Sequence, residues 1–258
     1  NDMRGFPFPF SKCLPPVPPI PGSTKAYGRN NSVTYSEFLT MLAPYEEKEF
    51  AAFQQKIIMP KTKILGVRTP EMRRIAREFR KNPEELLSFP DEYYEVTFIK
   101  LAAVSLLPYE KFCRLVGRCL PLIDNWELCD SFKADCLKRH KQDFLPYLSD
   151  FFATGKEFYR RYVLVTFLGF YTDKTYLPVI EEYLSRADTE KYYVHMAAAW
   201  LEAEVLVKYY DYGVHILQSG ILPPKTHDKA IQKARESFRL TKEQKGFLQS
   251  LKIKKRNG

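Results

Sequence analysis

Long apolar-rich blocks separated by short polar turns follow one another along the chain from Val33 onward. The stretches EYYEVTFIKLAAVSLL, from Glu92, and EFYRRYVLVTFLGFY, from Glu157, have the length of helices and exceed that of ordinary strands. No segment alternates apolar and polar residues convincingly enough to indicate a half-buried strand. The pattern therefore predicts an all-α fold.

Residues that favour helix ends mark several of the boundaries. Thr34 precedes one expected helix and Glu37 follows three residues later, which is the spacing of a capping box. Thr69 and Pro70 open another, where proline suits the first helical turn because the N–H it lacks would have no partner there. Most turns are short and carry Pro, Gly, Asp or Lys. The sequence thus predicts helices joined by tight connections.

Five of the expected helices resemble one another at a nearly fixed interval. They start near Glu92, Asn125, Glu157, Lys191 and His227, at intervals of 33, 32, 34 and 36 residues. Each interval has room for two helices and two turns, so a partner helix fits between successive members. This period predicts an α-solenoid of HEAT-like antiparallel helix pairs, in which each pair covers its neighbour's apolar face. The recurring helices would line a concave groove able to follow duplex DNA.

Positive charge is concentrated in two parts of the chain, whose net charge is +9. Residues 225–258 contain eleven Lys and Arg against three acidic residues, and residues 61–81 contain eight against two. Because neutralising phosphates releases counterions, such concentration indicates a polyanionic partner and makes the expected groove basic. A solvated helix face or a basic tail is the alternative explanation.

Composition excludes several classes of protein, including membrane-spanning, disulfide-linked and zinc-binding ones. Residues 1–32 hold seven of the eighteen prolines, which predicts a disordered or polyproline-II extension ahead of one domain, 33–258. No stretch approaches the ~20 apolar residues that span a bilayer, and we find no secretory signal pattern. Five cysteines without CxxC spacing fit neither a disulfide framework nor a zinc site. We expect a monomer in the bacterial cytosol or nucleoid that needs no metal or cofactor and contacts no membrane.

Polar and aromatic side chains occupy matching positions in successive recurring helices. Trp126 and Asp130 are four residues apart and share a helix face. The next recurring helix contributes Arg161, preceded by Arg160, and the following one contributes Trp200. A carboxylate inside the apolar frame WELCDSF needs a partner or a purpose. These residues are therefore the candidate site, although both tryptophans could instead be core anchors.

The same motifs, in this order, resemble those of the AlkD family of DNA alkylation repair proteins, which are HEAT-like repeat glycosylases that excise alkylpurines. The resemblance covers roughly Tyr35 to Leu251. KILGVRTPEMRRI, from Lys63, is similar to the first conserved segment, and NWELCDS, from Asn125, matches the Trp-x-x-x-Asp motif. EFYRRYVLVTF and KYYVHMAAAW resemble the segments with the active-site arginine and the second tryptophan. After Trp200 the chain reads Leu-Glu-Ala-Glu, which is more acidic than the family's arginine-containing stretch.

The resemblance implies a role for each candidate residue. Asp130 would be the catalytic carboxylate, Trp126 and Trp200 would flank the lesion-bearing nucleotide, and Arg161 would hold a neighbouring phosphate. It also implies that the lesion is handled without being flipped into a deep pocket. The expected DNA contacts are Arg68, Thr69, Arg73, Arg160, Lys229, Lys233 and Arg235.

The chemistry of alkylated purines suits this small set of residues. N7-methylguanine and N3-methyladenine are cationic and hence good leaving groups, so one carboxylate that stabilises the oxocarbenium-like sugar and positions water is sufficient. No P-loop, GxGxxG or GxSxG motif points to another reaction, and no lysine in the motif helices is placed for a Schiff base. We predict a monofunctional alkylpurine DNA glycosylase acting on duplex DNA. The alternatives are a non-catalytic HEAT-like module for bent or branched DNA, and a scaffold whose groove would be acidic or apolar.

Overall fold

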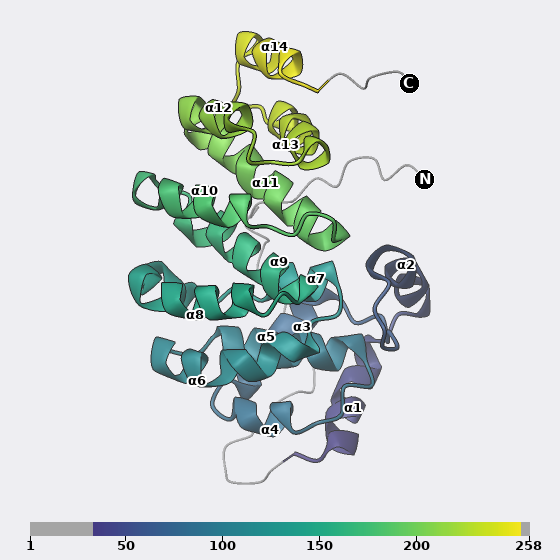
Figure 1. Ribbon diagram of the computed structural model, residues 1–258. Coiled ribbons are helices and arrows are strands. Elements are labelled where there is room, and N and C mark those ends of the chain that lie inside the picture. Colours follow the sequence, from purple (N-terminus) through teal and green to yellow (C-terminus); the bar gives the residue numbers. More distant parts are fainter. Residues whose placement is uncertain (1–32, 254–258) are drawn as a thin grey trace. The chain divides into compact units, whose positions relative to one another are not determined.

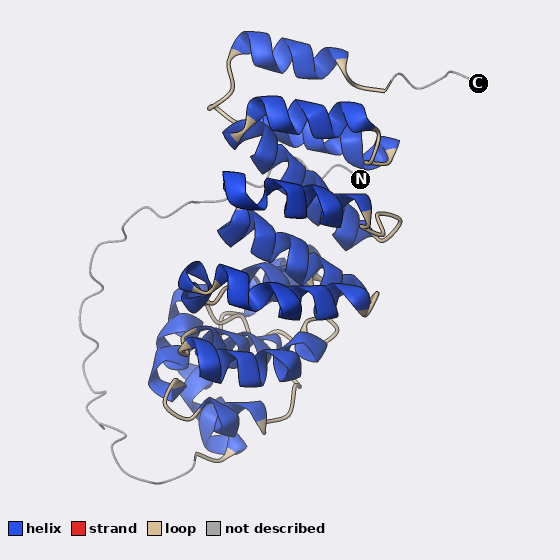
Figure 2. Cartoon of the chain, turned by 60° about the vertical axis from the view of Figure 1, so that its left-hand side comes forward, coloured by secondary structure: helices blue, strands red, loops and turns tan. Residues whose placement is uncertain are grey.

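The computed structural model describes residues 33–253, and within that range every regular element is a helix (Figure 1). The only β-type pairing among these residues is an isolated bridge between Lys63 and Tyr93. Seen from a second direction, the described part of the chain is again helices joined by short loops (Figure 2). The prediction of an all-α fold is confirmed. The expected proline-rich extension, 1–32, lies outside the described residues.

The helices follow the order and spacing that the sequence predicts. They are α1 (Tyr35–Leu42), α2 (Lys48–Ile58), α3 (Thr69–Phe79), α4 (Pro83–Leu87), α5 (Tyr94–Ser105), α6 (Tyr109–Cys119), α7 (Trp126–Ser131), α8 (Lys141–Ala153), α9 (Glu157–Thr166), α10 (Leu177–Ser185), α11 (Tyr192–Lys208), α12 (Tyr210–Ser219), α13 (Pro224–Glu236) and α14 (Lys242–Ser250). The five recurring helices are α5, α7, α9, α11 and α13.

The recurring helices form one continuous layer. α3 packs on α5, α5 on α7, α7 on α9, α9 on α11 and α11 on α13. A second row covers this layer: α6 packs on α5, α8 on α9, α12 on α11 and α14 on α13. Each helix thus buries its apolar face against the next pair, which is the packing of a helical solenoid. The concave, basic groove expected along this layer stays a prediction.

Burial explains why the middle of the layer is nearly apolar throughout. α5 and α11 contact neighbours on most sides, and ten residues of each are buried. α13, nearer the end of the stack, buries residues such as Thr226, Ala230 and Ala234, and leaves its lysines at the surface. The polar side chains within α5 and α11 therefore need local partners or a reason to be there.

A buried carboxylate fixes the loop that leads into α3. Glu95 of α5 is fully buried and accepts hydrogen bonds from the backbone N–H groups of Leu65, Gly66 and Val67, the shortest being 2.7 Å. Gly66 has a φ of +90°, and a Cβ there would lie 2.2 Å from the carbonyl oxygen of Glu47. The glycine in KILGVRTP is therefore required by both conformation and space.

Two further properties of residues 33–253 bear on function. No helix among them combines the length and the apolar character needed to cross a membrane. No group of three or more His, Cys, Asp or Glu side chains in this range is arranged to hold a metal ion.

Candidate active site

The short helix α7 carries two of the candidate residues and is fixed at its N-terminus by a buried cap. The side chain of Asn125 accepts hydrogen bonds from the N–H groups of Glu127 and Leu128 at 3.1 and 3.0 Å, and itself is fully buried. Such a cap satisfies N–H groups that have no partner within the helix. Trp126 follows the cap directly and Asp130 lies one turn later, so the cap sets the position of both.

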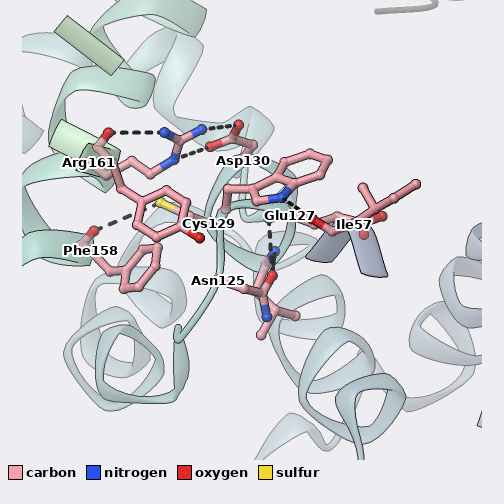
Figure 3. Close-up of polar contacts among 10 residues, drawn as sticks. Ile57, Asn125, Glu127, Cys129, Asp130, Phe158 and Arg161 are labelled. Atoms are coloured by element: carbon pink, nitrogen blue, oxygen red, sulfur yellow. Dashed lines mark hydrogen bonds and ion pairs between the residues drawn. The ribbon is translucent and has the colours of Figure 1, made fainter. Parts of the chain in front are cut away.

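Asp130 and Arg161 form a two-pronged ion pair (Figure 3). Nε of Arg161 donates to one carboxylate oxygen of Asp130 at 3.0 Å, and Nη2 donates to the other at 2.7 Å. The side chain of Arg161 is 1% exposed and that of Asp130 is 10% exposed. Two parallel charge-assisted hydrogen bonds fix the orientation of the carboxylate, which keeps a narrow edge open to solvent.

Opposing effects act on the ionisation of Asp130. Burial raises the pKa of its carboxyl group above the usual aspartate value, and the positive charges of Arg161 and Lys133 partly offset this increase. Arg161 in turn has a raised pKa because the carboxylate favours its charged form. Arg161 thus offsets part of the free-energy cost of burying the Asp130 carboxylate, and Asp130 in turn favours the charged form of the guanidinium.

Arg161 connects the carboxylate to α11. Its third donor, Nη1, bonds the carbonyl oxygen of Tyr193 at 3.0 Å, and its guanidinium lies 5.2 Å from the centre of the Trp200 ring. The structure thus brings Asp130, Arg161 and Trp200 together, as the sequence spacing predicts. The buried guanidinium is directed at protein groups, whereas the resemblance implied a phosphate contact, and that contact stays a prediction.

Trp126 is held from the other side of the site. Its indole Nε1 donates a hydrogen bond to the carbonyl oxygen of Ile57, near the end of α2, at 3.3 Å. Both Trp126 and Trp200 are partly exposed, so neither is a completely buried core anchor. The two rings therefore keep surface available to a ligand.

The roles of three residues in this arrangement were not predicted from the sequence. Lys133 is exposed and close enough to Asp130 to lower its pKa. Asn125 caps α7, and the backbone carbonyl of Tyr193 accepts a hydrogen bond from Arg161. Lys133 follows Asp130 by three residues in NWELCDSFK, but it lies beyond the end of α7 at Ser131, so helical spacing does not place it beside the carboxylate. The Tyr193 contact is made by backbone and leaves no mark in the sequence.

The basic residues near α3 differ in what they contact. Arg68 is half-exposed, pairs with Glu47 at 2.7 Å and lies over the ring of Phe50 at 4.0 Å. Thr69 begins α3, and Arg73 is exposed one turn later. Arg68 is thus paired with Glu47, whereas Arg73 is exposed and lies 5.9 Å from the centre of the Phe98 ring, and DNA contacts by all three residues stay predictions.

Arg160 points away from its neighbour Arg161. Its Nε donates to the carbonyl oxygen of Phe152 at 3.3 Å, and its Nη1 lies 3.6 Å from the carboxylate of Asp188. Arg160 thus joins α9 to α8 and to the segment before α11. The structure does not bring it to the Asp130 site, and its contact with DNA stays a prediction.

The C-terminal basic residues lie on two faces of α13. Lys229 and Lys233 are one turn apart on one face, and the charge of Lys233 together with partial burial lowers the pKa of Lys229. Arg235 instead donates to the side chain of Gln249 on α14. The two lysines therefore form a compact patch, whereas Arg235 bridges two helices.

The acidic stretch after Trp200 carries little free negative charge. Glu202 is fully buried, and Glu204 is paired with Lys208 at 3.2 Å and with Arg239 at 2.9 Å. Only Glu204 lies one turn from Trp200 on the same face of α11. Its charge is neutralised there, so the stretch adds little negative charge beside Trp200, although it supplies no arginine for a phosphate contact.

Stability should depend on pH through Glu202. Burial raises its pKa well above the usual glutamate value, and neither carboxyl oxygen has a hydrogen-bond partner. The folded state then retains a proton that the unfolded state releases, so the contribution of Glu202 to the free energy of unfolding is fully present below the ordinary glutamate pKa and is lost as pH rises, by up to about 1.4 kcal/mol per pH unit. Glu202→Gln should remove this slope, and its advantage in melting temperature should grow between about pH 5 and pH 8.

The exposed Glu190 provides the control for this measurement. Glu190→Gln should leave the pH dependence of the melting temperature as in the unmodified protein. If the melting temperatures of the unmodified protein and Glu202→Gln changed with pH in parallel, Glu202 would not be protonated in the folded state.

Comparison with known protein families gives a match over most of the described residues. A family model described as DNA alkylation repair enzyme matches residues 38–205. No curated protein matches the chain. The matched range includes all four candidate site residues, Trp126, Asp130, Arg161 and Trp200, and extends from α1 into α11. Helices α12, α13 and α14, with the Lys229 and Lys233 patch, lie beyond it.

Proposed function

The chain belongs to the DNA alkylation repair enzyme family, and on this premise we propose that it is a monofunctional DNA glycosylase. Its substrates would be alkylated, cationic purines such as N7-methylguanine and N3-methyladenine in duplex DNA. The observation that carries the proposal is the Asp130 carboxylate, held by two hydrogen bonds from Arg161 with one edge open beside partly exposed tryptophans. No cofactor is needed for this reaction.

In the proposed reaction the bond between C1′ of the deoxyribose and the base nitrogen breaks first. The bonding electrons pass to the cationic base, which leaves neutral, and positive charge develops on the sugar as an oxocarbenium-like species. The fixed carboxylate of Asp130 stabilises this charge, and its restricted contact with water strengthens the effect. No protonation of the leaving group is required, so a second acidic residue is unnecessary.

Water then attacks C1′ and completes the hydrolysis. Each oxygen of Asp130 accepts one hydrogen bond from Arg161 and has a further lone pair that can position the water and accept its proton. The product is an abasic site in an intact strand. Because Arg161 fixes the carboxylate, no reorganisation of that group is needed when the charge develops.

The other candidate residues would bind the duplex. Trp126 and Trp200 offer π faces to the sugar and to the cationic base, and a lesion handled between them would need no deep pocket. Lys133, Arg73, Lys229 and Lys233 would contact phosphates irrespective of sequence. Arg68, Thr69, Arg160 and Arg235 remain candidates for the same role. These contacts would lie along a concave groove of the HEAT-like layer.

Base release from a defined substrate tests the proposal. The chain should release N7-methylguanine from duplex DNA and leave alkali-labile sites, while strands not treated with alkali stay intact because no Schiff base forms. Unmodified duplex of the same sequence is the control. If the protein binds the duplex and releases no base, a non-catalytic module for bent or branched DNA becomes the better assignment.

A further inference from the structure

The loop between α13 and α14 presents a completely exposed aromatic side chain. Phe238 is 101% exposed, whereas Leu240, two residues later, is 6% exposed. Single exposed apolar residues are common on protein surfaces and by themselves indicate nothing. Whether Phe238 has a role depends on the rigidity of its loop, the position of the loop and the charge of the residues around it.

The loop is held firmly on both sides of Phe238. The backbone N–H of Ser237 bonds the carbonyl oxygen of Ala234 at 3.1 Å, and the Ser237 hydroxyl accepts the N–H of Arg239 at 3.2 Å. Leu240 is buried, and Thr241 then caps α14 through a capping box with Gln244. Phe238 therefore projects from a fixed frame, so little conformational entropy is lost when it contacts a ligand.

The loop is joined to α11, the helix that carries Trp200. Arg239 bonds the carboxylate of Glu204 at 2.9 Å, and Glu204 follows Trp200 by one turn on the same face of α11. One turn advances a helix by about 5.4 Å. The ring of Trp200 in turn lies 5.2 Å from the guanidinium of Arg161. Arg239, the residue after Phe238, is thus attached to the face of α11 that carries Trp200.

The charge around Phe238 indicates what kind of ligand it meets. Residues 225–253 contain eight Lys and Arg against three acidic residues. This excess of positive charge favours a polyanionic ligand over an apolar protein partner. An apolar side chain projecting from a segment rich in lysine and arginine is compatible with the arrangement used by DNA-binding proteins that insert a wedge between base steps.

We propose that Phe238 inserts into the base stack of duplex DNA next to the bound nucleotide and unstacks one base step. This inference rests on the proposed function, and it gives the C-terminal helices, beyond the range of the family match, a role in recognition. Unstacking locally bends the duplex and opens the sugar beside it to water. If the lesion is not flipped into a deep pocket, this unstacking would allow water to reach C1′.

Fluorescence of a base analogue tests the insertion. The probe is a duplex with 2-aminopurine, which brightens when unstacked, next to a 2′-fluoro N7-methylguanosine, whose fluorine destabilises the oxocarbenium and prevents cleavage. The full chain should raise the fluorescence on binding. Phe238→Ala should abolish the rise and weaken binding about tenfold, with an unchanged salt dependence because phenylalanine releases no counterions.

Two further variants separate insertion from general loss of binding. Phe238→Trp should retain the fluorescence rise, since indole also stacks on bases. Phe247, on α14, is 45% exposed in the same basic segment, and Phe247→Ala should behave as the unmodified protein. Both substituted positions are exposed, so the fold should be unaffected.

The outcomes distinguish this inference from the proposed function. If Phe238→Ala binds and unstacks the duplex as the unmodified protein does, the wedge is refuted even where N7-methylguanine is released normally. If no base is released and the fluorescence rise still depends on Phe238, the wedge stands and the glycosylase activity fails. A chain that does not bind duplex DNA would overturn both.

Discussion

Asp130→Asn should lower the rate of N7-methylguanine release by about 10²–10³-fold, the usual loss when one electrostatic stabiliser of a transition state is removed. Asparagine keeps the shape of the side chain and removes the charge that would stabilise the sugar cation. Affinity for the duplex should change little, because the proposed phosphate contacts come from other residues. Single-turnover base release and duplex binding, measured on the same preparations, check the two parts separately.

A matched substitution controls for the change from aspartate to asparagine. Asp135, in the segment after α7, is 82% exposed and pairs with Lys138. Asp135→Asn should release base at the rate of the unmodified protein. If Asp130→Asn also retained that rate, the carboxylate would not be the catalytic group. The pH profile adds a second check, because the raised pKa of Asp130 should place the loss of activity on the acid side above the ordinary aspartate range.

Arg161→Met should destabilise the protein by about 3–5 kcal/mol, because it leaves the buried carboxylate of Asp130 without its partner. The pKa of Asp130 should rise further, so that residual base release requires a higher pH than in the unmodified protein. Chemical denaturation gives the free energy of unfolding, and the pH dependence of base release reports the titration.

A double-mutant cycle shows whether this loss comes from the ion pair. The double variant, Arg161→Met with Asp130→Asn, removes both charges and should recover part of the stability lost in the single variant. Arg160→Met, at the neighbouring position of α9, should cost about 1 kcal/mol or less, since that arginine is more exposed and its ion pair is longer. Additive losses in the cycle would mean that Asp130 and Arg161 are not coupled.

The arrangement suggests why this site uses an arginine and a carboxylate together. A carboxylate in so restricted a site would otherwise take up a proton and lose the charge that the reaction needs. Arg161 favours its ionised form and fixes its orientation, while the Trp200 ring lies 5.2 Å from the guanidinium. In the proposed reaction the arginine would act as a positioning residue for Asp130.

Local properties of the sequence were sufficient to predict the helices and their order. Helical blocks, the Thr34 capping box and the Pro70 start signal depend on residues within a turn or two of one another. The interval of 32 to 36 residues also predicted that successive recurring helices pack together. The same period placed the candidate site residues on successive recurring helices. It therefore also predicted that Asp130, Arg161 and Trp200 lie close together.

Only the tertiary structure decided what each of these side chains contacts. Asp130 and Arg161 are 31 residues apart, and Trp126 bonds a carbonyl 69 residues away, so no local pattern specifies either partner. The same is true of Glu202 and Glu204, which are two residues apart: Glu202 is buried, and Glu204 is neutralised by two cations. Periodicity fixes which helices meet, whereas the rotation of each helix and the layers packed around it determine which side chains are buried, paired or left exposed, as Phe238 is.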